Sequence, residues 1–286
     1  MSAKLYKILL ISGIVLALLA IPIFGLTYSS SKNLEVDFLD VGQGDTILIK
    51  SPFGQNILVD GGPDGKVVEQ LGKKLPFWDK QIDLIVLTHP HDDHVTGLTE
   101  IIKRYDVRKI LYTGVVHDAP NYLAWLEEAR NKKIPLALVD RPQVIKLGEN
   151  CELDVLFPQK SFIGQGIENL NNSSIVAKLF YGQTSFLLTG DAEIAVEKDL
   201  LAASVDLKSQ VLKIGHHGSD TSSSEEFLEA VKPKFAVIEV GKDNDFGHPN
   251  LRILKRLERI GAEIFRTDLD GTIKFESDGM EINKKY

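Results

Sequence analysis

The chain has 286 residues, of which 43% are hydrophobic, and a net charge of −7. This length suits one or two domains that bury a real core, and the acidic balance argues against tight, non-specific binding to duplex nucleic acid. The single cysteine, Cys151, excludes an intrachain disulfide and a cysteine-based zinc site, so any metal must be held by His, Asp and Glu.

The first predicted element is a membrane helix. Lys4 and Lys7 precede residues 8–26, a run of apolar and small residues without charge. At about 1.5 Å per residue this run approaches the ~30 Å thickness of the hydrocarbon layer. We therefore predict a signal anchor and tether over residues 1–32, with one catalytic domain over residues 33–286. The lysines favour a cytoplasmic N-terminus and an extracytoplasmic domain. A cleaved signal peptide, which would release a secreted domain, is the alternative.

After the tether, short runs rich in β-branched residues alternate with amphipathic stretches. Three strands follow one another before the first helix, so strict β-α alternation is absent. Two mixed sheets packed face to face, with helices outside, fit this order better than one doubly wound sheet. Strands are predicted at 36–41, 45–50, 56–60, 83–88, 109–113, 136–140, 144–147, 151–157, 173–182, 184–190, 210–215 and 235–241, with two more near the C-terminus. Helices are predicted at 66–75, 97–105, 120–133, 193–203, 222–232 and 251–261.

The segment HPHDDH, residues 89–94, directly follows an apolar strand. Side chains two residues apart in an extended segment point the same way, so His89 and His91 can bind one metal ion together. Asp93 and His94 come where the chain turns into the helix expected near Gly97, and they aim at a second position. This layout predicts two divalent ions about 3.5–4 Å apart, sharing a water whose pKa they lower. Ligands of this kind suit zinc, manganese or iron.

Further candidate residues lie at the ends of later strands. Asp191 follows an apolar strand and is predicted to bridge the metals. Another strand delivers His216 and His217 to a Gly-Ser turn. We expect one of the two to complete the metal site, with His216 favoured, and the other to donate a proton or touch substrate. Lys213 in that strand is either a phosphate contact or a solvated residue, and His248 is a rim acid, a phosphate ligand or structural. His117 is interpreted as a surface histidine.

The pattern H-x-H-x-D-H with later Asp and His residues resembles the metallo-β-lactamase superfamily. Five blocks narrow the resemblance to the hydrolase domain of the ComEC/Rec2 competence proteins, which take up DNA. They are FLDVGQGDTILI (38–49), NNSS (171–174), LLTGD (187–191), KIGHHGS (213–219) and GHPN (247–250). This resemblance implies an αββα sandwich. Those proteins have many membrane helices, whereas one is predicted here, so we expect a hydrolase domain on an anchor without a channel role.

The resemblance also implies roles for individual residues. Asp60, at the end of ILVDGG, would orient a metal-ligating histidine. The superfamily usually has a third histidine about twenty residues before the bridging Asp, and here Asn172 or Ser174 takes its place. The metal at His89 and His91 would then be more weakly held, with water or a substrate oxygen filling the gap. Asn172 could bind a phosphate oxygen or make a turn at the strand entry, and Ser174 is a candidate substrate contact. Gln43 and Asp45 could lie near the site or be structural, and a structural role is favoured.

The predicted function is a metal-dependent phosphodiester hydrolase, most simply a DNA nuclease of the competence type that works with DNA-uptake machinery at the membrane. Asp93 would both bind metal and hold the attacking water, and His217 or His248 would protonate the leaving oxygen. Two alternatives stay open. One is hydrolysis of another ester, such as a cell-wall phosphodiester, a lactam or a thioester. The other is an inactive DNA-binding scaffold.

Overall fold

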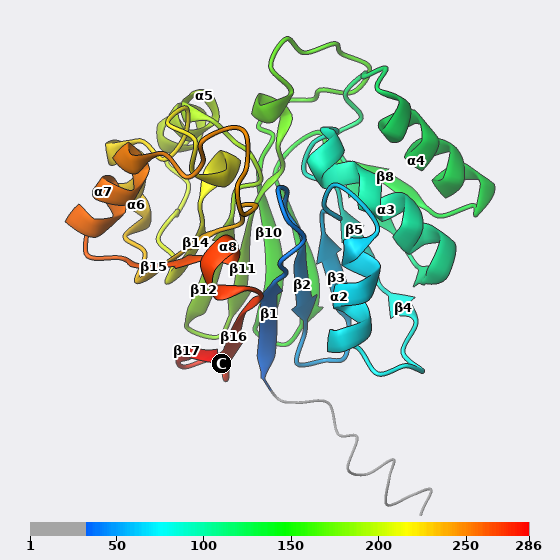
Figure 1. The fold of residues 1–286 in the computed structure, drawn as a ribbon, viewed down its shortest axis with the longest axis horizontal. Helices are drawn as coiled ribbons and strands as arrows, with labels where there is room; N and C mark the ends of the chain where they lie inside the picture. Colours follow the sequence, from blue (N-terminus) through cyan, green and yellow to red (C-terminus); the bar gives the residue numbers. More distant parts are fainter. Residues whose placement is uncertain (1–32, 286) are drawn as a thin grey trace, which may run out of the picture. The chain divides into compact units, whose positions relative to one another are not determined.

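Two mixed β-sheets lie face to face in the computed structural model, which describes residues 33–285 (Figure 1). The first sheet has the strand order β17-β16-β1-β2-β3-β5-β7-β8 and the second β15-β14-β13-β12-β11-β10-β9. Two short strands, β4 and β6, pair separately. In the first sheet β3, β5, β7 and β8 run parallel, and in the second β12 to β15 do. The other neighbours within these two sheets are antiparallel, as expected for mixed sheets, while β4 and β6 pair in parallel.

The bounds of these strands are as follows. The first sheet contains β1 (Leu34–Phe38), β2 (Ile47–Lys50), β3 (Asn56–Val59), β5 (Leu84–Val86), β7 (Ile110–Tyr112), β8 (Leu136–Leu138), β16 (Ile273–Ser277) and β17 (Ile282–Lys285). The second contains β9 (Gln143–Gly148), β10 (Cys151–Phe157), β11 (Val176–Tyr181), β12 (Thr184–Leu188), β13 (Val211–Lys213), β14 (Phe235–Ile238) and β15 (Glu263–Arg266). The small pair is β4 (Gln81–Ile82) and β6 (Asp106–Val107).

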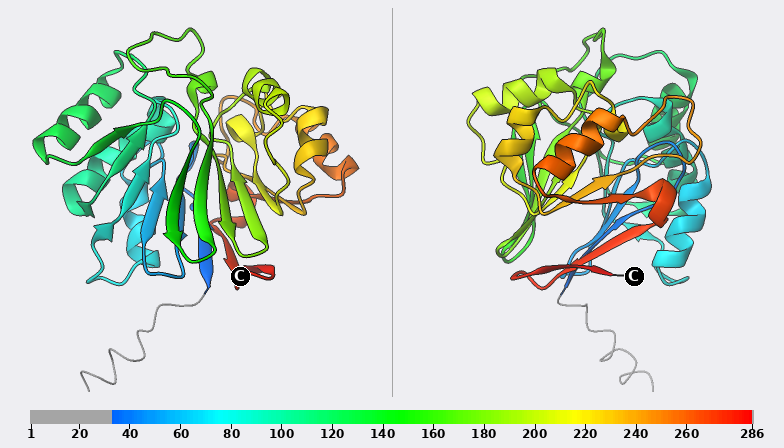
Figure 2. Two further views of the ribbon diagram at one scale, coloured as in Figure 1. Left: turned by 180° about the vertical axis from the view of Figure 1, so that it is seen from behind. Right: turned by 60° about the vertical axis from the view of Figure 1, so that its left-hand side comes forward.

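Helices cover the outer face of each sheet, as the two further views show (Figure 2). The first sheet is covered by α2 (Lys66–Lys74), α3 (Asp92–Arg104) and α4 (Pro120–Asn131). The second is covered by α5 (Ile194–Ala202), α6 (Glu225–Val231) and α7 (Leu251–Arg259). The short helix α8 (Thr267–Asp270) joins β15 to β16, and 3₁₀ turns η1 (Leu170–Ser173) and η2 (Gly215–Gly218) precede β11 and follow β13.

Three layers of apolar side chains hold the sandwich together. The layer between the sheets contains Phe38, Phe186 and Phe275, with ring centroids 6.1 and 6.2 Å apart in edge-on contacts. A second layer lies between the first sheet and α2 to α4, and a third between the other sheet and α5 to α7. Because each sheet is apolar on both faces, only the strand ends and loops are free to carry polar chemistry.

The predicted architecture of two mixed sheets with outer helices is confirmed. The predicted membrane helix over residues 8–26 lies outside the described residues. Within residues 33–285, no helix is long and apolar enough to cross a membrane. The sequence analysis also placed the start of α3 near Gly97, and this was wrong, because α3 begins at Asp92 inside the HPHDDH segment. Near the C-terminus it missed β17 and the short α8.

Helix α3 approaches the loop after β3 very closely, and glycines make this possible. The backbone N–H of Gly61 donates to the carbonyl of His94 (2.8 Å), and that of Gly97 donates to the carbonyl of Gly62 (3.1 Å). A Cβ at Gly97 would overlap the carbonyl oxygens of Gly61 and Asp64. This backbone-to-backbone contact fixes the loop that carries Asp60 against the helix that carries His94.

We predict that Gly97→Ala lowers the free energy of unfolding by about 3 kcal/mol, because backbone atoms cannot yield to the added methyl group. The matched control is Gly72→Ala, at an exposed position of α2 where an added Cβ meets no atom within 4 Å. That change should raise stability by about 0.5–1 kcal/mol. Urea unfolding followed by circular dichroism measures both. Equal effects of the two substitutions would contradict the close approach.

Candidate metal centre

The polar residues singled out in the sequence lie in the loops that follow strands of the sandwich. Asp60 directly follows β3, and His89 lies three residues after β5. Asp191 follows β12, and the turn η2, which follows β13, carries His216 and His217. Parallel neighbours end at the same edge of a sheet, so β3 with β5 and β12 with β13 each bring their loops together. The two groups of loops meet across the sandwich.

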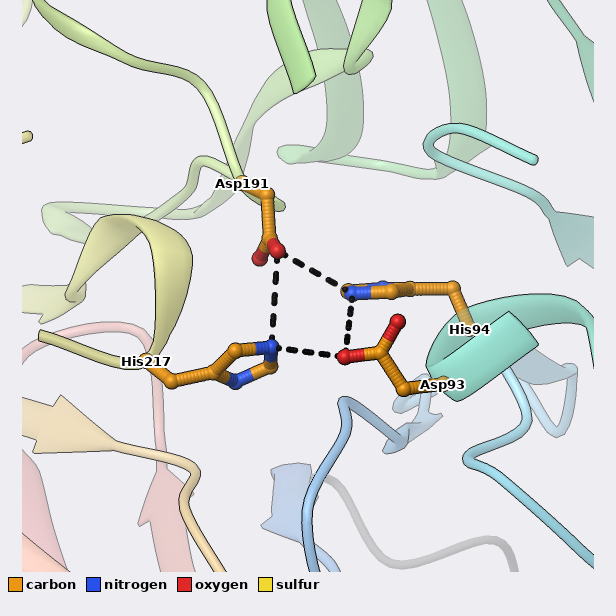
Figure 3. Close-up of side chains that lie close together, drawn as sticks. All are labelled: Asp93, His94, Asp191 and His217. Atoms are coloured by element: carbon orange, nitrogen blue, oxygen red, sulfur yellow. Dashed lines mark hydrogen bonds and ion pairs between the residues drawn. The ribbon is translucent and has the colours of Figure 1, made fainter. Parts of the chain in front are cut away.

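Asp93, His94, Asp191 and His217 converge in the described structure, each offering one donor atom within 4.8 Å of the others (Figure 3). Nε2 of His217 lies 3.1 Å from Oδ2 of Asp93 and 3.4 Å from Oδ2 of Asp191. Nε2 of His94 lies 3.3 Å from the same Asp191 oxygen and 3.8 Å from Oδ2 of Asp93. We call these four residues the Asp-His cluster.

His89 and His91 form a second group beside the Asp-His cluster. Nε2 of His89 is 3.0 Å from Nδ1 of His91 and 3.9 Å from Oδ2 of Asp191. The ring of His89 also lies 4.2 Å from that of His94, centroid to centroid. The Asp191 carboxylate therefore faces both groups, as a bridging ligand would.

The Asp-His cluster fits a divalent cation. Nε2 of His94 is a buried side-chain atom without a hydrogen-bond partner in the described structure. Such atoms are rare in proteins unless an ion or water satisfies them. All donors are imidazole nitrogens or carboxylate oxygens, a set that suits zinc, manganese or iron. The identity of the ion does not follow from this set.

The first turn of α3 aims two of these residues. The helix starts with Asp92 and Asp93, and His91 lies at its N-cap position. Carboxylates are favourable at a helix N-terminus because they face the positive end of the helix dipole. The charge pattern therefore starts the helix early, and it places Asp93 and His94 on a rigid element instead of a loop.

The turn η2 directs the side chains of the adjacent His216 and His217 into different surroundings. His216 (φ 48°, ψ 49°) and His217 (φ 52°, ψ 24°) both adopt left-handed backbone conformations, which are unusual for residues other than glycine. Ser222 holds the turn by donating to the carbonyl of Gly215 (2.7 Å). As a result His217 is buried in the Asp-His cluster, while the side chain of His216 remains 26% exposed.

The expectation that His216 is the ligand and His217 the proton donor therefore does not match the geometry. Nδ1 of His216 lies 3.1 Å from the Thr221 hydroxyl and 3.3 Å from the Glu193 carboxylate, outside the Asp-His cluster. Nδ1 of His217 lies 2.8 Å from the carbonyl of Glu239, so its Nε2 faces the cluster. The structure places His217 where His216 was expected.

Asp60 orients His94 as the sequence analysis expected. One carboxylate oxygen lies 2.8 Å from Nδ1 of His94 and accepts a hydrogen bond from the Thr88 hydroxyl (2.7 Å). The other accepts from the backbone N–H of Thr88 (2.8 Å). A carboxylate on Nδ1 fixes the tautomer that leaves Nε2 free to bind a metal.

Lys213 is fully buried behind the cluster, so both sequence interpretations of it, a phosphate contact or a solvated residue, were wrong. Its ammonium pairs with Asp45, donates to the carbonyl of Gly190 (3.1 Å) and lies 3.7 Å from Oδ1 of Asp191. Asp45 also lies 3.3 Å from Nδ1 of His217. Asp45 is thus structural, as expected, but it acts directly behind the site.

The electrostatics of this region follow from burial and close opposite charges. Although burial opposes the charged form, nearby carboxylates, Asp191 foremost, raise the pKa of His94 and that of His217 well above the usual value. Burial likewise opposes ionisation of Asp93 and Asp191, yet the same two histidines lower the pKa of both carboxyls. Burial lowers the pKa of His89, which favours the neutral ring that a metal requires. In the metal-free protein, the positive charges of protonated His94 and His217 therefore offset the negative charges of the Asp93 and Asp191 carboxylates.

A cavity of about 610 Å³ opens over the Asp-His cluster. His248 lies on its wall, 5.6 Å from the ring of His216, consistent with the predicted position at the rim. His117, which the sequence analysis treated as a surface residue, also lines the cavity, as do Gln43 and Phe246. Nothing in the residues around His117 or Phe246 signalled this, because loops distant in sequence bring them there.

Ser174 does not reach the cavity. It is fully buried, and its hydroxyl accepts a hydrogen bond from the backbone N–H of Asp191 (3.2 Å), so the predicted substrate contact is replaced by a role in positioning Asp191. Asn172 presents a buried amide oxygen without a hydrogen-bond partner in the described part of the chain. Its predicted contact with a phosphate stays a prediction.

The sandwich and its His-Asp cluster are those of a metal-dependent hydrolase, and the chain belongs to the metallo-beta-lactamase superfamily, whose family model matches residues 39–241. It is 31% identical over 262 residues to ComE operon protein 3 of Bacillus subtilis, covering 86% of this chain and 33% of that protein. It is 28% identical over 243 residues to competence protein ComA of Neisseria gonorrhoeae, covering 82% and 31%. The resemblance to competence proteins is confirmed, and the chain spans about a third of the length of these relatives.

A solved structure supports the fold. The diiron β-hydroxylase CmlA of Streptomyces venezuelae matches with a TM-score of 0.55 at 15% identity, covering 88% of this chain and 54% of that one. At this identity the likeness concerns the arrangement of sheets and helices alone.

We predict that Asp60→Asn weakens binding of Zn²⁺ or Mn²⁺ about 10- to 100-fold, because the ring of His94 loses its charged partner. The control is Asp64→Asn, an exposed residue of the same loop whose carboxylate only caps the N–H of Lys66. Titration calorimetry on folded protein measures both variants. Unchanged affinity in Asp60→Asn would contradict the orienting role.

Metal affinity should rise with pH between about pH 6 and pH 8. The raised pKa values of His94 and His217 mean that the metal-free protein holds protons on both rings, and metal binding must release them. Calorimetry in two buffers of different ionisation enthalpy gives the number of protons released. Affinity that is flat across this range, with no protons released, would contradict the charge balance described above.

Proposed function

We propose that this chain is a metal-dependent phosphodiester hydrolase that acts on DNA. The observation that carries the proposal is the Asp191 carboxylate beneath an open cavity, whose Oδ2 lies 3.9 Å from Nε2 of His89, 3.3 Å from Nε2 of His94 and 3.4 Å from Nε2 of His217. Two sets of N and O donors that share a carboxylate suit a pair of divalent ions. A site of this kind favours attack of water on an ester or phosphodiester.

In this proposal His89, His91 and Asp191 hold one ion, and Asp93, His94, His217 and Asp191 hold the other. Two bound cations would supply an acidified water and stabilise negative charge on phosphate oxygens. Asp60 and Glu239 fix the tautomers of His94 and His217 through the hydrogen bonds at Nδ1. The Asn171–Ser174 segment offers no imidazole, so the site at His89 and His91 is expected to be the weaker one.

His248 is the proposed proton donor to the leaving oxygen, since His217 lies within the Asp-His cluster. Burial, His216 and His217 lower the pKa of His248, so its ring is mostly neutral near pH 7 in the free protein. A phosphate anion bound beside it would favour the protonated ring. The ring lines the cavity, so a substrate oxygen can reach it.

Two lines of support point to DNA. A competence protein is among the relatives, and the match covers most of this chain. A phosphodiester is also the ester that two adjacent cations stabilise well during hydrolysis. Together with the predicted anchor over residues 8–26, this gives a single-pass membrane protein whose hydrolase domain meets DNA outside the cytoplasm.

The cavity also favours a second candidate. None of the described residues that line it is Lys or Arg, whereas duplex DNA is usually held by cationic side chains on its phosphates. Hydrolysis of a small phosphodiester or another small ester is therefore the alternative function.

The test uses the full chain purified in detergent, stripped of metal and then supplied with Zn²⁺ or Mn²⁺. Single-stranded DNA, duplex DNA and bis-p-nitrophenyl phosphate are assayed side by side. We expect DNA cleavage that requires metal and falls ~100-fold or more in Asp93→Asn. Asp92→Asn, an exposed carboxylate in the same helical turn, should leave metal content unchanged.

Each outcome separates the candidates. DNA cleavage lost in Asp93→Asn supports the nuclease. Cleavage of the small diester alone supports the alternative function. A protein that binds metal and cleaves none of these substrates would overturn phosphodiester hydrolysis in both forms and leave hydrolysis of another ester or the scaffold interpretation.

A further inference from the structure

We infer that Phe246 is a stacking platform for an unpaired nucleobase, so that the cavity takes single-stranded DNA or a frayed end instead of an intact duplex. This inference rests on the proposed function and deepens it by naming the form of the substrate. It rests on the exposure of Phe246, the polar contacts that hold its loop, and the lack of Lys and Arg among the described residues that line the cavity.

Phe246 is 70% exposed although it is a large apolar side chain beside a candidate active site. It lines the cavity together with His248, and the two rings are nearly parallel, 16° apart in plane with centroids 5.9 Å apart. The two stacked rings therefore form one aromatic surface at the rim, and His248 in turn meets the ring of His216 edge-on. A planar aromatic ligand could cover this surface and shield Phe246 from water.

The loop that carries Phe246 is held in place by polar contacts. The Asn244 side chain donates to the carbonyls of Gly241 (3.0 Å) and His248 (2.7 Å) and accepts from the N–H of His248 (3.0 Å). The N–H of Gly241 donates to the side chain of Gln43 (3.0 Å), which also lines the cavity. Because these bonds close the loop at both ends, the ring of Phe246 is presented without further ordering on binding.

The shape and charge of the cavity select the ligand. Its volume of about 610 Å³ lies in the range of sites for small molecules, so it accommodates a nucleotide better than a double helix. Without Lys or Arg among the described lining residues, recognition must come from the base and the metals. Bases in an intact duplex are stacked on one another and offer no free face to a protein ring, whereas an unpaired base does.

The test is binding of two decamers that resist cleavage, with Mn²⁺ present. Both have a phosphorothioate backbone, one with thymine bases and one without bases, and binding to the full chain in detergent is followed by fluorescence anisotropy. We expect the thymine decamer to bind about ten-fold tighter than the abasic one. Phe246→Ala should remove this preference and Phe246→Trp should keep it.

Phe77→Ala is the matched control. Phe77 is 82% exposed and in edge contact with Trp78, and it does not line the cavity. It should retain the wild-type preference for bases. Circular dichroism melting of each variant checks the fold, which exposed positions should leave intact.

The inference is overturned if the wild-type chain binds both decamers equally or binds neither, or if Phe246→Ala keeps the preference for bases. The proposed function fails separately, when no metal-dependent phosphodiester cleavage is found whatever the decamers show. A base preference that depends on Phe246 would support the stacking platform in either case.

Discussion

The site depends on a balance between the charges of side chains that are buried away from solvent. Asp45, Asp60 and Asp191 are all buried, and a buried carboxylate without a partner destabilises a fold by several kcal/mol. Lys213 compensates Asp45 and Asp191 from within the second sheet, and their charges raise the pKa of its ammonium against the effect of burial. Burial and Asp45 raise the pKa of neighbouring Glu239, whose Oε1 accepts from the N–H of Thr46 (2.9 Å). The donors that face the cavity are positioned by this network behind them.

Hydrogen bonds of the backbone also hold the candidate metal ligands in place. Two backbone hydrogen bonds, from Gly61 to His94 and from Gly97 to Gly62, join the loop after β3 to α3. Asp60 and His94 are therefore held in a fixed position relative to each other. Ser174 likewise positions Asp191, because its hydroxyl accepts a hydrogen bond from the backbone N–H of Asp191. His94, His217 and Asp191 are thus each held by a contact with a residue outside the ligand set, which is the usual requirement for a site that must keep its geometry through turnover.

Much of this was predictable from the sequence. The alternation of short strands and amphipathic helices predicted the sandwich, and HPHDDH with Asp191 predicted most of the cluster, because those residues are adjacent in sequence or follow apolar strands. The charges of Asp92 and Asp93 could also have placed the start of α3, had the helix dipole been considered. Lys213 was misjudged as accessible because a lone lysine in a strand is usually solvated, although parallel strands covered on both faces bury every side chain. The left-handed turn determines which of His216 and His217 faces the Asp-His cluster. These backbone angles could not be predicted from the identities of the two adjacent residues.

That turn has an evolutionary consequence. At both positions of the His-His pair the backbone favours Gly or Asn over most residues, since these two adopt left-handed conformations most readily. Neither can supply an imidazole. A descendant in which His217 changes to Asn or Gly would keep the backbone turn, lose a candidate ligand and leave the carboxylates of Asp93 and Asp191 with one charge partner fewer. The backbone path therefore tolerates this change better than the site does, and a relative with the same turn and a silent site can arise in a single step.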